Sequence, residues 1–232
     1  HGASQYADIP LGLYFLAVLV LIVFQDTFPK HAVGNAVLLG LHLGLSAWTK
    51  NEGMLFSSVV LSLYFVIQGI CLKKRAFFHN ACFPLIGGLL PLLFTMLSFK
   101  IVIAPPNDLL SGQNVQSTLE KLTDMSRYVI TGKAFVRQFV EPYSLLYSTP
   151  VVIFFLYALF VGVEWTQLKK PVILCSLLSI VFVLLGYFGI YLTTPHDLSW
   201  HLATSFSRLS LQLWPSVIFV ALLIMTSPDE HD

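Results

Sequence analysis

A polar stretch near the carboxyl end of the chain, residues 194–208, carries the residue types best suited to chemistry. Thr194 followed by Pro195 is typical of a helix start, with a hydroxyl N-cap and proline at the first helical position. In the helix that follows, four polar side chains recur at spacings of four, four and three, and therefore share one face: Asp197, His201, Ser205 and Arg208. An acid, an imidazole, a hydroxyl and a guanidinium in line predict a site for a phosphorylated or sugar-bearing substrate.

Two other interpretations of this stretch stay open. One is an interfacial amphipathic helix without a site, although anchoring needs fewer kinds of polar group. The other is a divalent cation such as zinc between His196 and His201, which the five-residue spacing disfavours because it splays the rings.

The elements that position these residues are predicted to lie in a membrane. Hydrophobic residues make up 56% of the 232 and charged residues 11%, against roughly a quarter charged in soluble domains. The net charge of +1 argues against nucleic acid as a partner. The three cysteines are odd in number and lie at or inside apolar runs, so no disulfide framework is implied.

About seven apolar runs are long enough to predict membrane helices, because about 20 residues span a bilayer. They are Pro10–Phe24, Val33–Trp48, Met54–Leu72, Ala81–Ala104, Pro150–Trp165, Pro171–Leu192 and Leu209–Thr226. An open sheet cannot span lipid, so all of them are expected to be helices. Pro84, Pro91 and Pro215 predict kinks or late helix starts.

The basic clusters predict which ends of these helices face the cytoplasm. Lys73 to Arg75, Lys169 with Lys170, and Lys30 go inside by the positive-inside rule. The external face then receives the polar constellations: the segment with Asp8, the turn with Lys50 and Glu52, the loop 105–149, and residues 194–208. Apolar residues near helical spacing predict amphipathic interfacial helices within that loop.

The predicted fold class is therefore all-α, a polytopic integral membrane helix bundle with external amphipathic interfacial helices. Residues 1–232 are expected to form a single membrane domain, with 105–149 as its external loop. The chain begins at His1 and no basic segment precedes its first apolar run, so we expect a fragment of a longer protein rather than a signal peptide.

Polar residues at the other predicted external helix ends are further candidates. Asp8 opens the first span, where it is either an N-cap beside the interfacial Tyr6 or a substrate-binding acid. Glu52 in the tight turn is either a solvated anchor or a functional acid. Lys100 near the end of the fourth span either snorkels to the headgroups or binds a lipid phosphate.

Three of these segments resemble a known family. Tyr6-Ala7-Asp8-Ile9-Pro10-Leu11, the turn Lys50-Asn51-Glu52-Gly53, and Asp197-Leu198-Ser199-Trp200-His201-Leu202 followed by Ser205 and Arg208 are similar to elements of bacterial GT-C glycosyltransferases. These are the relatives of protein O-mannosyltransferases and of the aminoarabinose transferase that modifies lipid A. The motifs are short, and they are spread over the whole chain.

The resemblance implies an enzyme of the bacterial inner membrane that works on the external, periplasmic face. Such an enzyme moves a sugar from a polyprenyl-phosphate carrier to a lipid, glycan or protein acceptor. Asp8 would be the catalytic carboxylate, and the substrate-binding residues would be Arg208, His201, Asp197, Lys100, Glu52 and Tyr6. The family's principal acidic residue lies in a first external loop, which this chain does not match, so Asp8 corresponds to its second acidic element.

Cofactor motifs are absent from the sequence, and two other functions remain as alternatives. There is no Walker loop or Rossmann glycine pattern, so no nucleotide is expected, and a divalent cation is the one cofactor left open. A transporter or flippase of lipid-linked or anionic solutes is the main alternative, although transporters often carry inverted repeats and midplane sites. A membrane scaffold is the third, and it leaves the stripe from Asp197 to Arg208 unexplained.

Overall fold

Helices account for nearly all of the chain that the structure describes. The computed structural model describes residues 7–103, 114–140 and 145–226, and within them β structure is limited to one isolated bridge between Val163 and Met225. The α-helices are α2 (Asp8–Thr27), α3 (Ala32–Thr49), α4 (Asn51–Cys71), α5 (Lys74–Ala76), α6 (Phe83–Val102), α7 (Val115–Thr123), α8 (Met125–Val140), α9 (Leu145–Phe160), α10 (Pro171–Thr193) and α11 (Leu198–Ile224). Short 3₁₀ turns occur at η1 (Pro29–His31) and η3 (Gln167–Lys169), and η2 (Phe77–Cys82) is a π-helical turn.

Six stretches of helix are long and apolar enough to cross a membrane, so by length and composition the chain is an integral membrane protein. They are α2, η1 with α3, α4, α5 through α6, α10 and α11. These six agree with six of the predicted spans. The predicted span at Pro150–Trp165 falls on α9, which has 16 residues. At about 1.5 Å per residue such a helix falls short of the roughly 30 Å hydrocarbon core, so a seventh span stays a prediction.

Helix α11 contains two segments that were predicted as separate helices. The predicted polar helix and the predicted last span form one helix of 27 residues, with Pro215 inside it. A helix of that length covers about 40 Å, more than the roughly 30 Å hydrocarbon core. Its polar first turns can therefore lie among lipid headgroups while the remainder crosses.

The described helices divide into two compact units. Unit 1 comprises residues 1–104, 165–183 and 210–224, and unit 2 comprises residues 105–164, 184–209 and 225–232. Helices α10 and α11 contribute residues to both units.

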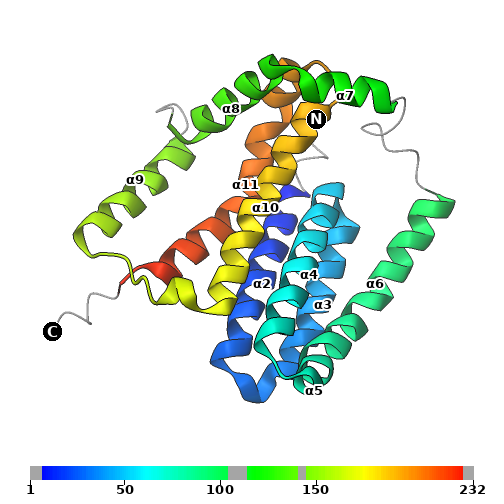
Figure 1. The fold of residues 1–232 in the computed structure, drawn as a ribbon, viewed down its shortest axis with the longest axis vertical. Helices are drawn as coiled ribbons and strands as arrows, with labels where there is room; N and C mark the ends of the chain where they lie inside the picture. The colour runs from blue at the N-terminus through cyan, green and yellow to red at the C-terminus, as the bar shows by residue number, and fades with distance from the viewer. Residues whose placement is uncertain (1–6, 104–113, 141–144, 227–232) are drawn as a thin grey trace. The chain divides into compact units, whose positions relative to one another are not determined.

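Helix α3 is the centre of unit 1, where it contacts α2, α4 and α6 (Figure 1). Helices α3 and α6 approach each other through glycine. A methyl group on Gly40 would overlap the carbonyl group of Leu85, and one on Gly88 would overlap that of Val37. Close backbone approach at small residues is the usual basis of helix packing in membranes, where lipid tails are as apolar as leucine.

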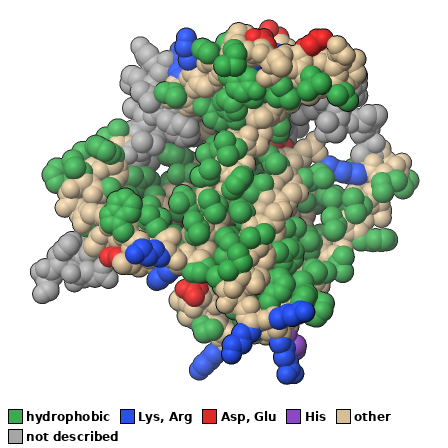
Figure 2. Space-filling view, in the orientation of Figure 1, with side chains coloured by type: hydrophobic (Ala, Val, Ile, Leu, Met, Phe, Trp, Pro, Cys, Tyr) green, Lys and Arg blue, Asp and Glu red, His purple; other side chains and the backbone are tan. Residues whose placement is uncertain are grey.

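Apolar side chains fill the interior of unit 1 and also cover its outside. Helix α2 buries residues at helical spacing, and Phe15 stacks on Phe56 of α4 with ring centroids 3.9 Å apart. On α6, Phe94 remains 74% exposed and Ile101 81% exposed, and apolar side chains cover much of the surface in Figure 2. A surface of this kind suits contact with lipid.

Unit 2 is built around aromatic rings. Phe135 of α8 stacks on Phe206 of α11 at 4.3 Å, and Tyr191 of α10 meets Phe206 edge-on at 5.9 Å. Helices α7 and α8 are both amphipathic, which confirms helices within residues 105–149. Their position outside the membrane stays a prediction.

Candidate functional site

The start of α11 in unit 2 differs in one respect from the sequence prediction. The N-cap is Asp197, whose carboxylate accepts a hydrogen bond of 2.8 Å from the backbone N–H of Trp200. Thr194 was predicted to cap this helix, which is wrong by three residues. Its hydroxyl instead accepts from the backbone N–H of His196 at 3.3 Å and pairs with Nδ1 of His201 at 2.9 Å. The carboxylate of Asp197 therefore caps the start of α11, and its side chain remains exposed.

The predicted polar face of α11 is turned partly toward the preceding helix. The Ser205 hydroxyl donates to the backbone carbonyl of His201 at 2.7 Å and lies 2.7 Å from the hydroxyl of Tyr191 on α10. Because the proton of Ser205 is used in the first bond, Tyr191 is the donor in the second. Arg208 follows three residues later and is half-buried. The ring of His201 thus has a fixed hydroxyl partner, and Ser205 is held between two helices.

Arg127 on α8 was not singled out from the sequence, yet it holds unit 2 together. Its Nε donates to the carbonyl of Leu192 at 2.8 Å, and its Nη2 donates to that of Tyr191 at 3.1 Å. The last carbonyls of a helix lack intrahelical partners, so a guanidinium satisfies the carboxyl end of α10 and complements its dipole. The spacing of residues gives no signal for this contact, because 65 positions separate Arg127 from Leu192.

Asp124 fixes the beginning of α8 in front of Arg127. Its carboxylate accepts the backbone N–H of Ser126 at 2.9 Å. Hydrogen bonds from the Ser126 side chain and backbone, with the nearby Arg127 charge, hold the pKa of Asp124 below its ordinary value. A lowered pKa means that this contribution to stability is present above the ordinary pKa and disappears as the pH falls through the lowered value.

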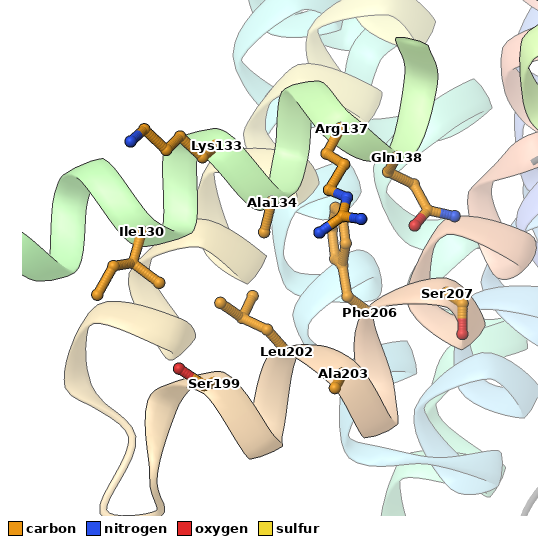
Figure 3. Close-up of a pocket in the computed structure, with 10 residues that line it drawn as sticks. All are labelled: Ile130, Lys133, Ala134, Arg137, Gln138, Ser199, Leu202, Ala203, Phe206 and Ser207. Atoms are coloured by element: carbon orange, nitrogen blue, oxygen red, sulfur yellow. The ribbon is translucent and has the colours of Figure 1, made fainter. Parts of the chain in front are cut away.

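A groove lies between α8 and the first turns of α11, within unit 2 (Figure 3). Its volume is about 550 Å³. Helix α8 contributes Ile130, Lys133, Ala134, Arg137 and Gln138, and helix α11 contributes Ser199, Leu202, Ala203, Phe206 and Ser207. In Figure 3 the guanidinium of Arg137 extends over the groove above Phe206. Lys133 and Arg137 were not among the predicted site residues, although two cations one turn apart on an amphipathic helix could have indicated them.

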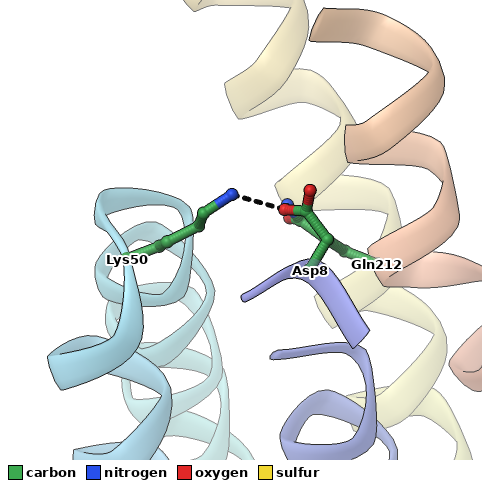
Figure 4. A network of polar contacts seen from close by, with 3 residues as sticks. All are labelled: Asp8, Lys50 and Gln212. Atoms are coloured by element: carbon green, nitrogen blue, oxygen red, sulfur yellow. Dashed lines mark hydrogen bonds and ion pairs between the residues drawn. The ribbon is translucent and has the colours of Figure 1, made fainter. Parts of the chain in front are cut away.

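The second polar cluster lies in unit 1 and centres on Asp8 (Figure 4). Lys50 Nζ is 2.5 Å from Asp8 Oδ1, and Gln212 Nε2 donates to the same oxygen at 2.7 Å. Asp8 is 2% exposed, and the Lys50 side chain is 16% exposed. The alternative of Asp8 as an N-cap is wrong, because Ala7 occupies that position and Asp8 lies inside the first turn of α2. The carboxylate instead connects the start of α2 to the turn between α3 and α4 and to α11.

A neighbouring pair extends this polar region of unit 1. Lys100, in the last turn of α6, donates from Nζ to Asn51 Oδ1 at 2.7 Å and lies 2.8 Å from Met54 Sδ. Glu52 is half-buried in the first turn of α4. The turn between α3 and α4 therefore meets the start of α2 through Lys50 and the end of α6 through Asn51. The Tyr6 prediction lies outside the described residues.

The structure thus distributes the predicted site residues over two clusters, one in each unit. Asp8, Glu52 and Lys100 lie at helix ends of unit 1, while Asp197, His201 and Arg208 lie on α11 in unit 2. In the part of the chain that is described, no three His, Cys, Asp or Glu residues are placed to hold a metal ion together. The chain matches no family model, and comparisons with curated proteins and with solved structures give no match either.

Proposed function

We propose that the chain belongs to a membrane enzyme that moves a sugar from a polyprenyl-phosphate carrier to an acceptor at the external face of the bacterial inner membrane. The observation that supports this most is the groove of unit 2, because it combines cations with an apolar floor. A lipid-linked sugar donor has the same two features, a phosphate and a hydrocarbon chain.

The lining of the groove suits each part of such a donor. Arg137 and Lys133 lie one turn apart on α8, and a guanidinium can donate two parallel hydrogen bonds to one phosphate. Leu202, Ala203 and Phe206 of α11 give the groove an apolar lining that suits the isoprenoid chain. Cations at the headgroup level would also stabilise the charge that grows on the phosphate as the sugar leaves.

Asp8 remains the proposed catalytic carboxylate, acting on the hydroxyl or amine of the acceptor. Its surroundings add a condition to that role. Asp8 is 2% exposed, with Lys50 and Gln212 both on Oδ1, so it can meet an acceptor only if the side chains that bury it move. Arg208, His201 and Asp197 remain proposed contacts of the substrate, and His201 would act with its Thr194 bond in place.

The groove can be tested by binding before any transfer is measured. Farnesyl phosphate serves as a probe for the full chain in detergent, with farnesol and inorganic phosphate as partial probes. Charge-assisted hydrogen bonds contribute about 1.5–3 kcal/mol, and the groove is open to solvent, so Arg137→Gln should weaken binding about tenfold. Lys121→Gln, on α7 and outside the lining of the groove, should leave binding unchanged. Equal binding of farnesyl phosphate by the Arg137 variant would remove the groove from the proposal.

A transfer assay separates the enzyme from the transporter or flippase. Liposomes that hold a labelled polyprenyl-phosphate sugar are incubated with the protein, and both release of the sugar from its carrier and movement of the intact lipid between leaflets are followed. Release that Asp8→Asn lowers by at least about tenfold supports an enzyme. Movement of the intact lipid without release of sugar supports a flippase and would contradict the proposed function.

A further inference from the structure

A cluster of exposed cations, here termed the basic end, lies in unit 1. It consists of Lys73, Lys74 and Arg75 after α4 and of Lys30 in the turn after α2. The turn η2, which follows Lys73 to Arg75 in the chain, contacts both α3 and α4. Lys and Arg side chains gather at the corresponding end of α2, α3 and α4 in Figure 2.

The charge of the basic end is poorly balanced by acids of the same turns. Residues 25–31 and 72–83 contain four lysine or arginine side chains and one carboxylate, Asp26. All four cations are exposed. The backbone is extended at Leu72 and Lys73 and then turns into α5 at Lys74. A cluster of this kind attracts a ligand with negative charge.

Aromatic rings close to these cations in the sequence indicate a second property of the ligand. Phe77 packs against Phe65 at 6.2 Å and Phe78 at 5.2 Å, and Phe78 packs against Phe83 at 5.6 Å. Phe78 is 39% exposed and Phe83 65% exposed. These rings lie in and after the π-helical turn η2, a form of helix that is rare and frequently marks functional sites. Exposed rings next to cations suit a ligand whose charge sits beside hydrocarbon.

We propose that the basic end is a binding site for the phosphate headgroup of an anionic phospholipid. Lys73, Lys74, Arg75 and Lys30 contact the phosphate, while Phe78 and Phe83 lie against the first carbons of the acyl chains. The depth of the site fits this occupant, because α4 and the helical stretch that begins at Lys74 are membrane-length and the cations stand where they meet. Lipid phosphates lie at that boundary.

The experiment measures the dissociation constant of fluorescent phosphatidylglycerol for the full chain in neutral detergent micelles, with fluorescent phosphatidylcholine as the uncharged probe. A cation near an anionic surface contributes about 1 kcal/mol, or roughly fivefold in binding. Lys73→Gln with Lys74→Gln and Arg75→Gln should therefore weaken phosphatidylglycerol binding by one to two orders of magnitude at low salt. Phosphatidylcholine binding should not change, and the loss should shrink as salt is raised.

Two further variants make the result specific. Lys73→Arg with Lys74→Arg keeps the charge and should bind as the unaltered chain does, which separates binding from misfolding. Lys121→Gln with Lys169→Gln and Lys170→Gln removes three cations elsewhere and should retain most of the binding. Equal loss in this control would overturn the proposal, since net charge alone would then explain the effect. Inorganic phosphate that displaces the lipid when the two are at equal concentration would overturn it too, since the rings would then contribute nothing to the affinity.

Discussion

Replacing Lys50 by methionine tests whether the buried carboxylate of Asp8 depends on its cation. Removing one partner of a buried ion pair costs about 3–5 kcal/mol, because the remaining charge keeps its desolvation penalty. Asp8 is 2% exposed, but the Lys50 side chain is 16% exposed and Gln212 still donates to the carboxylate. We therefore expect Lys50→Met to lower the free energy of unfolding by about 3 kcal/mol, the lower end of that range.

A double-mutant cycle shows whether this loss comes from the pair. Asp8→Asn alone should cost less than Lys50→Met, because the lysine is the more exposed partner. The variant with both changes contains neither charge, and removing a whole buried pair is often close to neutral. It should thus be more stable than Lys50→Met alone, with a coupling energy of at least about 1 kcal/mol.

The assay is reversible unfolding of the full chain in mixed micelles as the fraction of denaturing detergent rises, followed by circular dichroism and tryptophan fluorescence. Lys30→Met is the matched control, because Lys30 is an exposed lysine in a turn of the same unit. It should change stability by less than about 0.5 kcal/mol. If Lys50→Met is no less stable than Lys30→Met, or if the two single effects simply add, the account of Asp8 as a buried charge held by Lys50 is refuted.

Three further predictions concern packing, the end of α10 and the substrate. Gly88→Ala should destabilise unit 1 by about 1–3 kcal/mol because its methyl group meets the carbonyl of Val37, while Gly87→Ala, with nothing within 4 Å, should change stability little. Unfolding in mixed micelles checks this pair, and equal losses would contradict it. Arg127→Gln should lower the stability of unit 2 by about 1.5–3 kcal/mol, because the hydrogen bonds to the end of α10 are lost. Proteolysis within α8 should then be faster, and an unchanged cleavage rate would show that these bonds contribute nothing. Arg208→Lys should reduce sugar transfer at least about tenfold if a bidentate phosphate contact is lost, whereas full turnover would remove Arg208 from the site.

The helices of this chain were predictable because a membrane helix requires a run of about 20 mostly apolar residues, which can be found in the sequence directly. Five predicted spans agree with separate membrane-length helices, and the last one agrees with the second part of α11. The extent of α11 was harder to predict. Residues 197–208, which carry the polar face, are followed directly by the apolar span, and no helix-breaking residue marks a boundary between them. Thr194 and Asp197 are both good caps, and only the backbone path decides between them.

The candidate site was predictable in its residues but not in its contacts. Spacing along one helix located His201, Ser205 and Arg208, since a single helix defines its own faces. Spacing could not pair Asp8 with Lys50 and Gln212, which are 42 and 204 positions away. The contact of Arg127 on α8 with the end of α10 could not be predicted either, because it forms only when these helices pack against each other.

The polar residues fall into two groups, those that hydrogen-bond within their own helix and those that hydrogen-bond to another helix. Many hydroxyls inside the helices donate to the carbonyl one turn earlier, as Ser46, Ser58 and Ser176 do, and such bonds need no partner from elsewhere in the chain. The bonds of Asp8 and of Arg127 cross between helices instead. A polar group in a low-dielectric interior is costly unless it is paired, so a side chain that depends on a distant helix constrains how the two helices pack. For that reason Lys50, Gln212 and Arg127 control the geometry of the two clusters, and substitutions there should disturb Asp8 and the groove of unit 2 before they unfold the helices themselves.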